Sequence, residues 1–367
     1  MKEKKLLLAI AGGGTGGHVY PGIAVAEELR NRGGESFFLG TERGLENRIV
    51  PKAGFDFFVV EAAPIERKKP WLIFSELIQN LRGIISGRNI LQKKRPQALL
   101  GTGGYVSFSS AFAAWSLGIP VIINEQNAVP GLANKILSNF AALCISAWEP
   151  KENFWKCPVK KIGLPVRKDF FCTNRKSARK EFGLKENDIA VLFFGGSRGS
   201  ISINRAVSAI AKRLADEKIF IIWGTGTEHF ENVMRMSGVP SEKMRILPYI
   251  DNMPAALSAA DIAVTRSGAM TVAEIAAIGI PSILVPFPYA TGDHQKANAL
   301  KLKESNAAEM ICDEEVSEKL YDSISMLIND SKKRFVMSES VRSFCDPDSA
   351  KKMADEIEKV IESGAKE

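Results

Sequence analysis

The stretch AGGGTGGHVYPG, residues 11–22, decides the fold of the first half of the chain. It follows the apolar run LLLAIA, residues 6–11, and leads into VAEELRNRGG, residues 25–34, which gives the order strand, glycine-rich turn, helix. Backbone N–H groups at a helix start attract anions and oxygen-rich ligands, and glycines let a ligand approach closely. The turn residues Thr15, Gly16 and Gly17 are therefore candidate ligand-binding residues.

His18 follows this turn and is one of three histidines in the chain. We expect it just ahead of the helix, whose dipole disfavours a protonated imidazole, so that the ring can accept a proton near neutral pH. The alternative is a histidine that only hydrogen-bonds to the loop. Pro21 is expected in the first helical turn, where its missing N–H costs nothing. The pattern favours a functional His18.

The same order of elements returns in the second half of the chain. It occurs in IAVLFFGGSRGSISINRAVSAIAKRL, residues 189–214, and again in TRSGAMTVAEIAAIGIP, residues 265–281. Such alternation is typical of α/β folds with parallel strands. It predicts two Rossmann-like domains facing each other across a cleft, at residues 1–165 and 166–345. The remaining residues, 346–367, are expected to form a helix that packs back on the first domain.

The composition limits the function classes. The 367 residues include 49 Lys and Arg against 42 Asp and Glu, and the net charge of +7 suits an anionic partner. The five cysteines are widely spaced and indicate neither a disulfide framework nor a zinc site. No apolar run approaches the ~20 residues of a transmembrane helix. The run LLLAIA is also too short for a signal peptide, so we expect the protein to stay in the cytosol.

Two rival functions rest on short motifs. Gly12, Gly14 and Gly17 match the G-x-G-x-x-G fingerprint of dinucleotide-binding domains, which keeps an NAD(P)-dependent oxidoreductase open. That function needs an acid after the second strand to hold the ribose, and Glu42 is the nearest candidate, slightly too far along.

No metal site is expected, because the D-x-D sequence at residues 346–348 suits the start of the last helix better.

The second rival is a serine hydrolase. GGSRG, residues 195–199, matches the G-x-S-x-G turn of α/β-hydrolases, and the order Ser197, Asp251 or Asp261, His294 fits their triad. The first half of the chain has a matching glycine turn without a serine. This favours a role for Ser197 in holding a phosphate, with added charge from Arg198.

Residues 66–96 combine apolar side chains at helical spacing with many Lys and Arg. The apolar positions are Trp71, Phe74, Ile78, Leu81 and Ile85. Such a stretch can lie on an anionic membrane, or its apolar face can pack into the core, and the pattern alone favours core packing. Gly83 and Gly87 argue against one long helix.

Taken in order, the motifs resemble those of one enzyme family. They are GGGTGGHVYPGIAVAEEL, GTGGYVS, NEQNAVPGLANK, GLPVR, GGSRGS, YIDNM, TRSGAMTVAEIAAIGIPSILVPFP and DHQKANA. This set is similar to the MurG family of glycosyltransferases, from about residue 5 to residue 300 without a gap. The resemblance implies the two-domain GT-B fold, no cofactor and no nucleic-acid partner.

The family's reaction sets the expected function. The resemblance implies inverting transfer of N-acetylglucosamine from UDP-N-acetylglucosamine to the 4-hydroxyl of undecaprenyl-pyrophosphoryl-N-acetylmuramyl-pentapeptide (lipid I to lipid II) in peptidoglycan synthesis. It also implies peripheral attachment to the cytoplasmic face of the cell membrane through residues 66–96, with Trp115 nearby, and other cell-wall synthesis proteins as further partners. Another sugar-nucleotide transferase of this fold, acting on a different lipid, stays open.

The resemblance assigns roles residue by residue. Thr15, Gly16 and Gly17 lie near the donor sugar and diphosphate, Asn127 contacts the donor sugar, and Tyr105 lines the acceptor cleft. His18 is the first candidate for the catalytic base, and Glu125 is the second. The residues assigned to the nucleotide and its sugar are Arg167, Ser197, Ile250 through its backbone, Ala269, Met270, Thr271, Glu274 and Gln295. The chain departs from the family pattern at Leu164, Asn124, Arg198 and Ser200.

Overall fold

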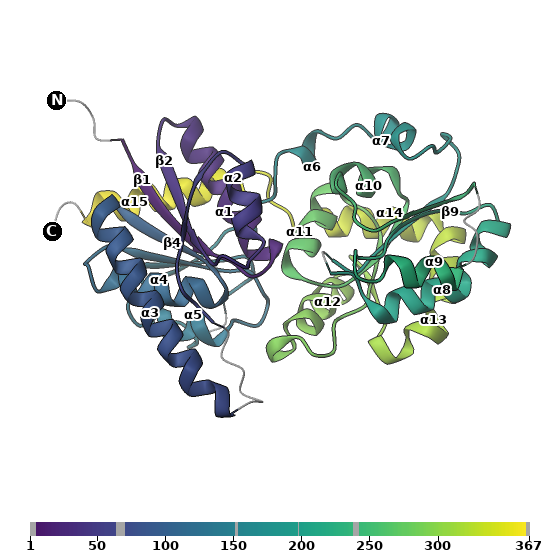
Figure 1. The fold of residues 1–367 in the computed structure, drawn as a ribbon. Helices are drawn as coiled ribbons and strands as arrows, with labels where there is room; N and C mark the ends of the chain where they lie inside the picture. Colours follow the sequence, from purple (N-terminus) through teal and green to yellow (C-terminus); the bar gives the residue numbers. More distant parts are fainter. Residues whose placement is uncertain (1–4, 64–69, 151–152, 197, 238–241, 365–367) are drawn as a thin grey trace. The chain divides into compact units, whose positions relative to one another are not determined.

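The computed structural model describes residues 5–63, 70–150, 153–196, 198–237 and 242–364, which form two α/β units (Figure 1). The first unit comprises Met1–Arg167 and Asp346–Glu367, and the second comprises Lys168–Cys345. Each unit is built on one sheet, and every strand pair in the described part of the chain is parallel. The prediction of two Rossmann-like halves is therefore confirmed.

The sheet of the first unit has seven strands in the order β3-β2-β1-β4-β5-β6-β7. The strands are β1 (Leu7–Gly12), β2 (Glu35–Gly40), β3 (Asp56–Val59), β4 (Ala98–Gly103), β5 (Val121–Glu125), β6 (Leu143–Ser146) and β7 (Val159–Lys161). The order reverses between β1 and β4. In open parallel sheets, ligands bind beyond the carboxyl ends of the strands at such a reversal.

Six helices cover the two faces of this sheet. They are α1 (Gly16–Asn31), α2 (Glu46–Lys52), α3 (Pro70–Lys94), α4 (Gly104–Trp115), α5 (Leu132–Leu137) and α15 (Ser349–Gly364). Alternate residues of β1 point to opposite faces, as strand geometry requires. Leu8 and Ile10 pack with α1, α2 and α15, whereas Ala9 and Ala11 pack on the face of α3, α4 and α5.

The last helix, α15, belongs to the core of the first unit. Met353, Ala354 and Ile357 are fully buried in the cluster that contains Leu8 and Ile10. Arg32 at the end of α1 adds a polar clamp, because its Nη1 lies 2.7 Å from Asp355 Oδ1 and 3.0 Å from Glu358 Oε2. The chain thus returns to its first unit after completing the second.

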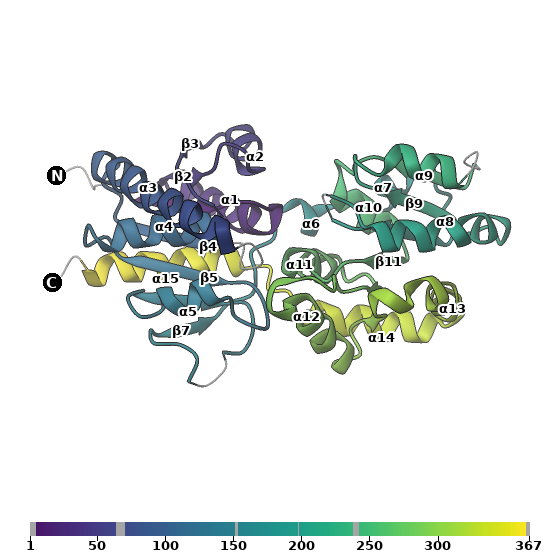
Figure 2. The same cartoon turned by 60° about the horizontal axis from the view of Figure 1, so that its bottom comes forward.

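Helix α3 packs beside the shorter helix α4 (Figure 2). The expectation that Gly83 and Gly87 would interrupt it is wrong, since one helix spans Pro70–Lys94. A methyl group on Gly83 would come within 1.8 Å of the Glu61 carbonyl oxygen, and one on Gly87 would touch Ala113. Gly83 therefore permits a close approach that outweighs its low helix propensity, whereas a side chain at Gly87 would make only ordinary contacts.

The second unit repeats the plan with six strands in the order β10-β9-β8-β11-β12-β13. They are β8 (Ala190–Phe194), β9 (Phe220–Gly224), β10 (Met244–Leu247), β11 (Ile262–Thr265), β12 (Ser282–Leu284) and β13 (Glu309–Met310). The order reverses between β8 and β11, which corresponds to the reversal between β1 and β4 in the first unit. The residue 195–200 turn and the start of α11 follow these two strands.

The helices of the second unit complete its core. They are α6 (Asp169–Cys172), α7 (Arg175–Glu181), α8 (Ile201–Asp216), α9 (Phe230–Ser237), α10 (Met253–Ala259), α11 (Ala269–Ile278), α12 (His294–Glu304), α13 (Val316–Asn329) and α14 (Ser331–Arg342). Two short 3₁₀ turns lie at Thr291–Asp293 and Asp313–Glu315. The main cluster joins β8, β9, β11 and β12 to α8 and α13 around the buried Trp223.

Candidate active site

The first glycine turn joins β1 to α1. Thr15 is the N-cap, and Gly16 and Gly17 are the first two helical residues. His18 therefore lies in the first turn of α1, and the expectation that it precedes the helix is wrong. Pro21 is likewise deeper in the helix than expected. Gly14, with φ +86°, turns the chain so sharply that the helix can begin directly after Thr15.

His18 is held against the end of β4. Its Nδ1 lies 3.1 Å from the carbonyl oxygen of Thr102, and this oxygen also accepts a 2.7 Å hydrogen bond from Gln126 Nε2. A carbonyl oxygen can only accept, so Nδ1 carries the proton and Nε2 is the basic nitrogen of the neutral ring. A methyl group on Gly103 would lie 2.5 Å from Nδ1, so glycine is needed beside the imidazole.

Tyr105 and the β5 end complete this edge of the first sheet. Tyr105 is the second residue of α4, and a methyl group on Gly14 would lie 3.4 Å from its ring. Glu125 is only 3% exposed at the end of β5. Its Oε1 accepts a hydrogen bond from the Asn127 N–H at 2.9 Å, and its Oε2 accepts from Asn134 Nδ2, also at 2.9 Å. The Glu125 carboxylate thus shapes the loop that presents Asn127.

One functional candidate escaped the sequence analysis. Glu46, the first residue of α2, is 1% exposed, and its Oε2 accepts a 3.0 Å hydrogen bond from the Gly14 N–H. Glu42, the acid that the dinucleotide motif pointed to, is exposed instead. No local sequence pattern points to Glu46, because its partner Gly14 lies 32 residues earlier in the chain.

Arg167 ends the first unit. Its guanidinium carbon lies 4.9 Å from the ring centre of Tyr20 on α1, which is the geometry of a cation–π contact. The structure thus places Arg167 beside the helix that carries His18.

The glycine turn at residues 195–200 follows β8 in the second unit. Ser197 lies outside the described residues, and Arg198 is exposed. Ser200 caps α8 through its hydroxyl, which accepts from the Ile203 N–H at 3.4 Å. Gly199 has φ +76°, and a methyl group on it would lie 2.1 Å from the Thr225 carbonyl oxygen. This close approach requires glycine and brings two strand-end turns together.

The start of α11 forms the neighbouring part of this edge. Gly268 is the N-cap, and Ala269 begins the helix. Met270 is buried, whereas Thr271 and Glu274, three residues apart on one helix face, are partly exposed. The Ile250 side chain is buried against Gly224.

A partly buried ion pair supports the turn ahead of α11. Arg266 Nη1 lies 2.5 Å from Asp313 Oδ1, and the same nitrogen donates to the Val285 carbonyl oxygen at 3.0 Å. Burial lowers the pKa of the Arg266 guanidinium, while the bond to Asp313 opposes that shift. Arg266 Nη2 also donates to Ser202 Oγ at 3.0 Å, so one side chain links α8, α11 and the turn after β13.

Gln295 is oriented by two interactions in the second unit. Its backbone oxygen accepts from Ser267 Oγ at 2.8 Å, and its side-chain Oε1 accepts from the Phe287 N–H at 3.0 Å. Since the backbone N–H must donate, the amide orientation is fixed with Oε1 toward Phe287. The Nε2 group of Gln295 is then the donor end of the side chain.

The geometry argues against a catalytic triad with Asp261. This residue precedes β11, and its Oδ2 accepts from the Ala190 N–H at the start of β8 at 2.9 Å. Asp261 also pairs with Arg175 across 2.6 Å. The residue 195–200 turn follows the other end of β8, about five residues or ~16 Å away along the strand. Asp261 therefore stabilises the amino edge of the sheet.

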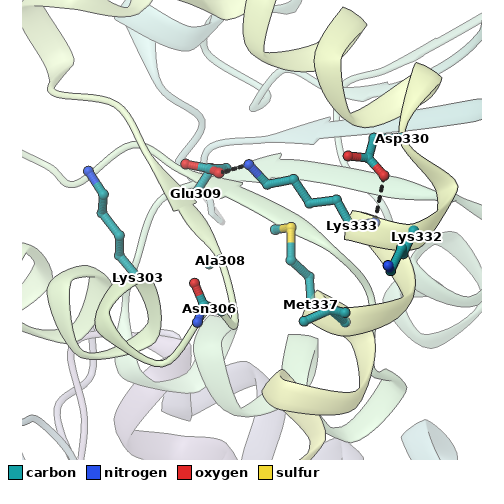
Figure 3. Close-up of a pocket in the computed structure, with 9 residues that line it drawn as sticks. Lys303, Asn306, Ala308, Glu309, Asp330, Lys332, Lys333 and Met337 are labelled. Carbon is teal, nitrogen blue, oxygen red and sulfur yellow. Dashed lines mark hydrogen bonds and ion pairs between the residues drawn. The ribbon is translucent and has the colours of Figure 1, made fainter.

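Two cavities lie at that same amino edge of the second sheet. One has a volume of about 410 Å³, and Figure 3 shows Lys303, Lys332 and the Lys333–Glu309 ion pair around it. The other, of about 600 Å³, is lined by Arg175 among others. Ligands of parallel sheets bind beyond the carboxyl ends, so neither cavity coincides with the candidate site.

Within the described ranges, no group of three acidic, His or Cys side chains could hold a metal ion.

Comparison with known proteins assigns both halves of the chain to domains of one glycosyltransferase family. The model of the glycosyltransferase family 28 N-terminal domain matches residues 8–145, and that of the C-terminal domain matches residues 190–358. The crystal structure of Acinetobacter baumannii MurG is similar, with a TM-score of 0.77 and 27% identity over 97% of this chain and 100% of that one. The calicheamicin glycosyltransferase CalG4 shares the fold at 16% identity, with a TM-score of 0.71 over 98% and 99% of the two chains.

Two relatives of known name narrow the assignment from glycosyltransferase family 28 to one enzyme within it. The UDP-N-acetylglucosamine–N-acetylmuramyl-(pentapeptide) pyrophosphoryl-undecaprenol N-acetylglucosamine transferase of Carboxydothermus hydrogenoformans is 38% identical, over 96% of this chain and 97% of its own length. The Bacillus subtilis enzyme of the same name is 37% identical, over 96% and 99%. The two halves are thus those of a family 28 glycosyltransferase with the GT-B fold. Within that class, the chain belongs to the MurG family.

Proposed function

We propose that this chain transfers N-acetylglucosamine from UDP-N-acetylglucosamine to undecaprenyl-pyrophosphoryl-N-acetylmuramyl-pentapeptide, converting lipid I to lipid II in peptidoglycan synthesis. The observation that carries this proposal is the 36–41% identity to transferases of that name along at least 91% of the chain. The glycine turns at the strand ends lie within the aligned halves. They suit a ligand with a diphosphate and sugar hydroxyls.

The donor nucleotide is assigned to the second unit. The N–H groups at the start of α11 and in the residue 195–200 turn would stabilise negative charge on the departing UDP, a term that is often the largest in catalysis. Ser197 is part of this assignment. Glu274 would accept hydrogen bonds from the ribose hydroxyls, and Gln295 would donate from Nε2 to the sugar. Thr271 and Met270 belong to the same helix start, and Ile250 would meet the uracil through its backbone.

The acceptor and its attacking hydroxyl are assigned to the first unit. In an inverting displacement, the 4-hydroxyl attacks C1 of the donor sugar while UDP leaves, and a base removes the hydroxyl proton. His18 suits this role because its bond to Thr102 makes Nε2 the basic nitrogen. Glu125 suits it less, since both of its carboxylate oxygens already accept hydrogen bonds. Tyr105 and Asn127 would then orient the sugars.

Attachment to the membrane is assigned to the α3 side of the first unit. None of the described helices has the length and apolar character needed to cross a bilayer. Leu81 and Ile85 on α3 are 57% and 55% exposed, and Trp115 at the end of α4 is 48% exposed. These values run against the core-packing alternative for this stripe, although the side chains of Trp71 and Phe74 lie outside the described part. An apolar face beside Arg82 and other cations suits an anionic lipid surface.

A radiolabelled transfer assay tests the proposed function. The full chain is incubated with UDP-N-acetylglucosamine or UDP-glucose, with and without the lipid-linked acceptor. We expect labelled product only from UDP-N-acetylglucosamine with the acceptor, and no loss of activity with a chelator. Transfer to other lipids in preference to the muramyl acceptor would overturn the substrate assignment. Labelling of Ser197 by a fluorophosphonate, or binding of NAD(P)H, would instead favour one of the rival functions.

A further inference from the structure

Glu46 is a buried carboxylate that links two loops at the carboxyl edge of the first sheet. Its Oε1 accepts hydrogen bonds from the Thr41 N–H at 2.9 Å and the Thr41 hydroxyl at 2.8 Å. Its Oε2 accepts from the Gly14 N–H at 3.0 Å, across 32 residues of sequence. The loop after β2 is thereby tied to the glycine turn after β1.

The glycines around Glu46 form a cradle for its side chain. A methyl group on Gly13 would lie 2.2 Å from Oε1, one on Gly44 would lie 2.1 Å from it, and one on Gly40 would lie 2.5 Å from Cγ. No larger residue fits at these positions while Glu46 keeps its place. Part of the glycine content of the opening stretch therefore serves an internal carboxylate and not an external ligand.

The carboxylate occupies a hydrogen-bond donor of the glycine turn, the Gly14 N–H, which an anionic ligand could otherwise use. Its donors are two backbone N–H groups and a hydroxyl, and as the first residue of α2 it also lies at the positive end of that helix. Hydrogen bonds to an ionised acceptor are stronger than neutral ones, so the Gly14 N–H is held firmly in one direction. The turn is fixed before any substrate arrives.

We propose that Glu46 is a positioning residue for transfer: it fixes the turn that presents Thr15 and His18 to the substrates. This inference rests on the proposed function for its kinetic consequences, but the ordering of the turn does not depend on it. Replacement by glutamine would put an NH₂ group against either Gly14 or Thr41, because an amide has only one accepting oxygen. The turn would then lose one of its two anchors while the residue keeps its size.

The test compares Glu46→Gln with Glu42→Gln, which removes the same charge from the exposed acid four residues earlier. We expect Glu46→Gln to lower kcat about 10-fold to 100-fold relative to Glu42→Gln, at a temperature where both variants remain folded. Hydrogen exchange of the peptide covering residues 11–18 should be faster in Glu46→Gln only. An unchanged kcat, or equal hydrogen exchange of this peptide in the two variants, would overturn the positioning role.

A second variant covers the case in which Glu46→Gln does not fold. Thr41→Val removes only the hydroxyl donor, and we expect about a threefold to tenfold fall in kcat with faster exchange over residues 11–18. Normal exchange and normal kcat in Thr41→Val would contradict the inference. If the wild-type chain shows no transfer, the proposed function fails, and the exchange comparison alone still decides whether Glu46 orders the turn.

Discussion

The Nδ1 atom of His18 donates a hydrogen bond to the carbonyl oxygen of Thr102 across 3.1 Å. This contact joins α1 to the end of β4 and fixes the tautomer of the ring, so that Nε2 is the nitrogen able to take a proton. Thr102 also donates from its hydroxyl to the His18 carbonyl oxygen at 2.7 Å, which holds both the backbone and the ring of His18. If His18 is the proposed base, this fixed orientation lowers the entropy cost of bringing the ring into position for proton transfer.

Replacing His18 with alanine tests its role as the base. General base catalysis typically contributes ~10²–10⁴-fold, so we expect kcat to fall within that range. UDP should bind with unchanged affinity, since the nucleotide is assigned to the other unit. Steady-state kinetics with the lipid acceptor and calorimetric titration with UDP give the two quantities. Near-normal turnover in the variant would move the base role to Glu125 or another group.

Glu274 is expected to recognise the ribose of the donor. If its carboxylate accepts from both hydroxyls, the wild-type protein should bind UDP about tenfold more tightly than 2′-deoxy-UDP. Glu274→Ala should weaken UDP binding and abolish this preference. Competition titrations with the two nucleotides measure the ratio in each protein. A preference that survives in the variant would show that another group reads the 2′-hydroxyl.

The repeated order of strand, glycine turn and helix was predictable from sequence because buried parallel strands are continuous apolar runs, such as residues 190–194, that end at glycines. The roles of individual polar residues were harder to predict. Glu46 gains its function from a contact with Gly14, and no local pattern reveals a partner 32 residues away. The continuity of α3 through Gly83 was misread because helix propensity ignores the neighbouring chain, which leaves no space for a side chain at that position.

The ion pair between Asp188 and Lys243 predicts a pH-dependent stability. Their atoms lie 2.8 Å apart, and the hydrogen bond from Lys243 lowers the pKa of the Asp188 carboxyl below its ordinary value. A depressed pKa in the folded state stabilises the protein above the unfolded pKa of ~3.9, and this gain is lost as pH falls through the folded value. Asp188→Asn should therefore lower the free energy of unfolding at pH 7 by about 1 kcal/mol.

The difference between wild type and Asp188→Asn should shrink as the pH falls below ~4, where the wild-type carboxyl takes up its proton. Urea unfolding at several pH values measures this difference. Glu186→Gln, a charge change at an exposed neighbour in the same loop, serves as the control and should stay near wild type throughout. A difference for Asp188→Asn that is constant from pH 7 to pH 3 would contradict the linkage.

The exposed apolar stripe of α3 predicts binding to anionic lipid. Complete burial of an aliphatic side chain is worth about 1.5–3 kcal/mol, but Leu81 and Ile85 are already nearly half-buried, so lipid can bury only the remaining part. The double change Leu81→Gln and Ile85→Gln should therefore weaken binding to phosphatidylglycerol vesicles about 10-fold to 100-fold. Phe335→Gln, at an exposed aromatic residue of the second unit, is the matched control. Vesicle sedimentation measures binding, and added salt should weaken it because exposed cations contribute. Transfer to a water-soluble acceptor analogue should be unchanged in the double variant. If both variants bind vesicles as the wild type does, the lipid-facing surface lies elsewhere on the chain.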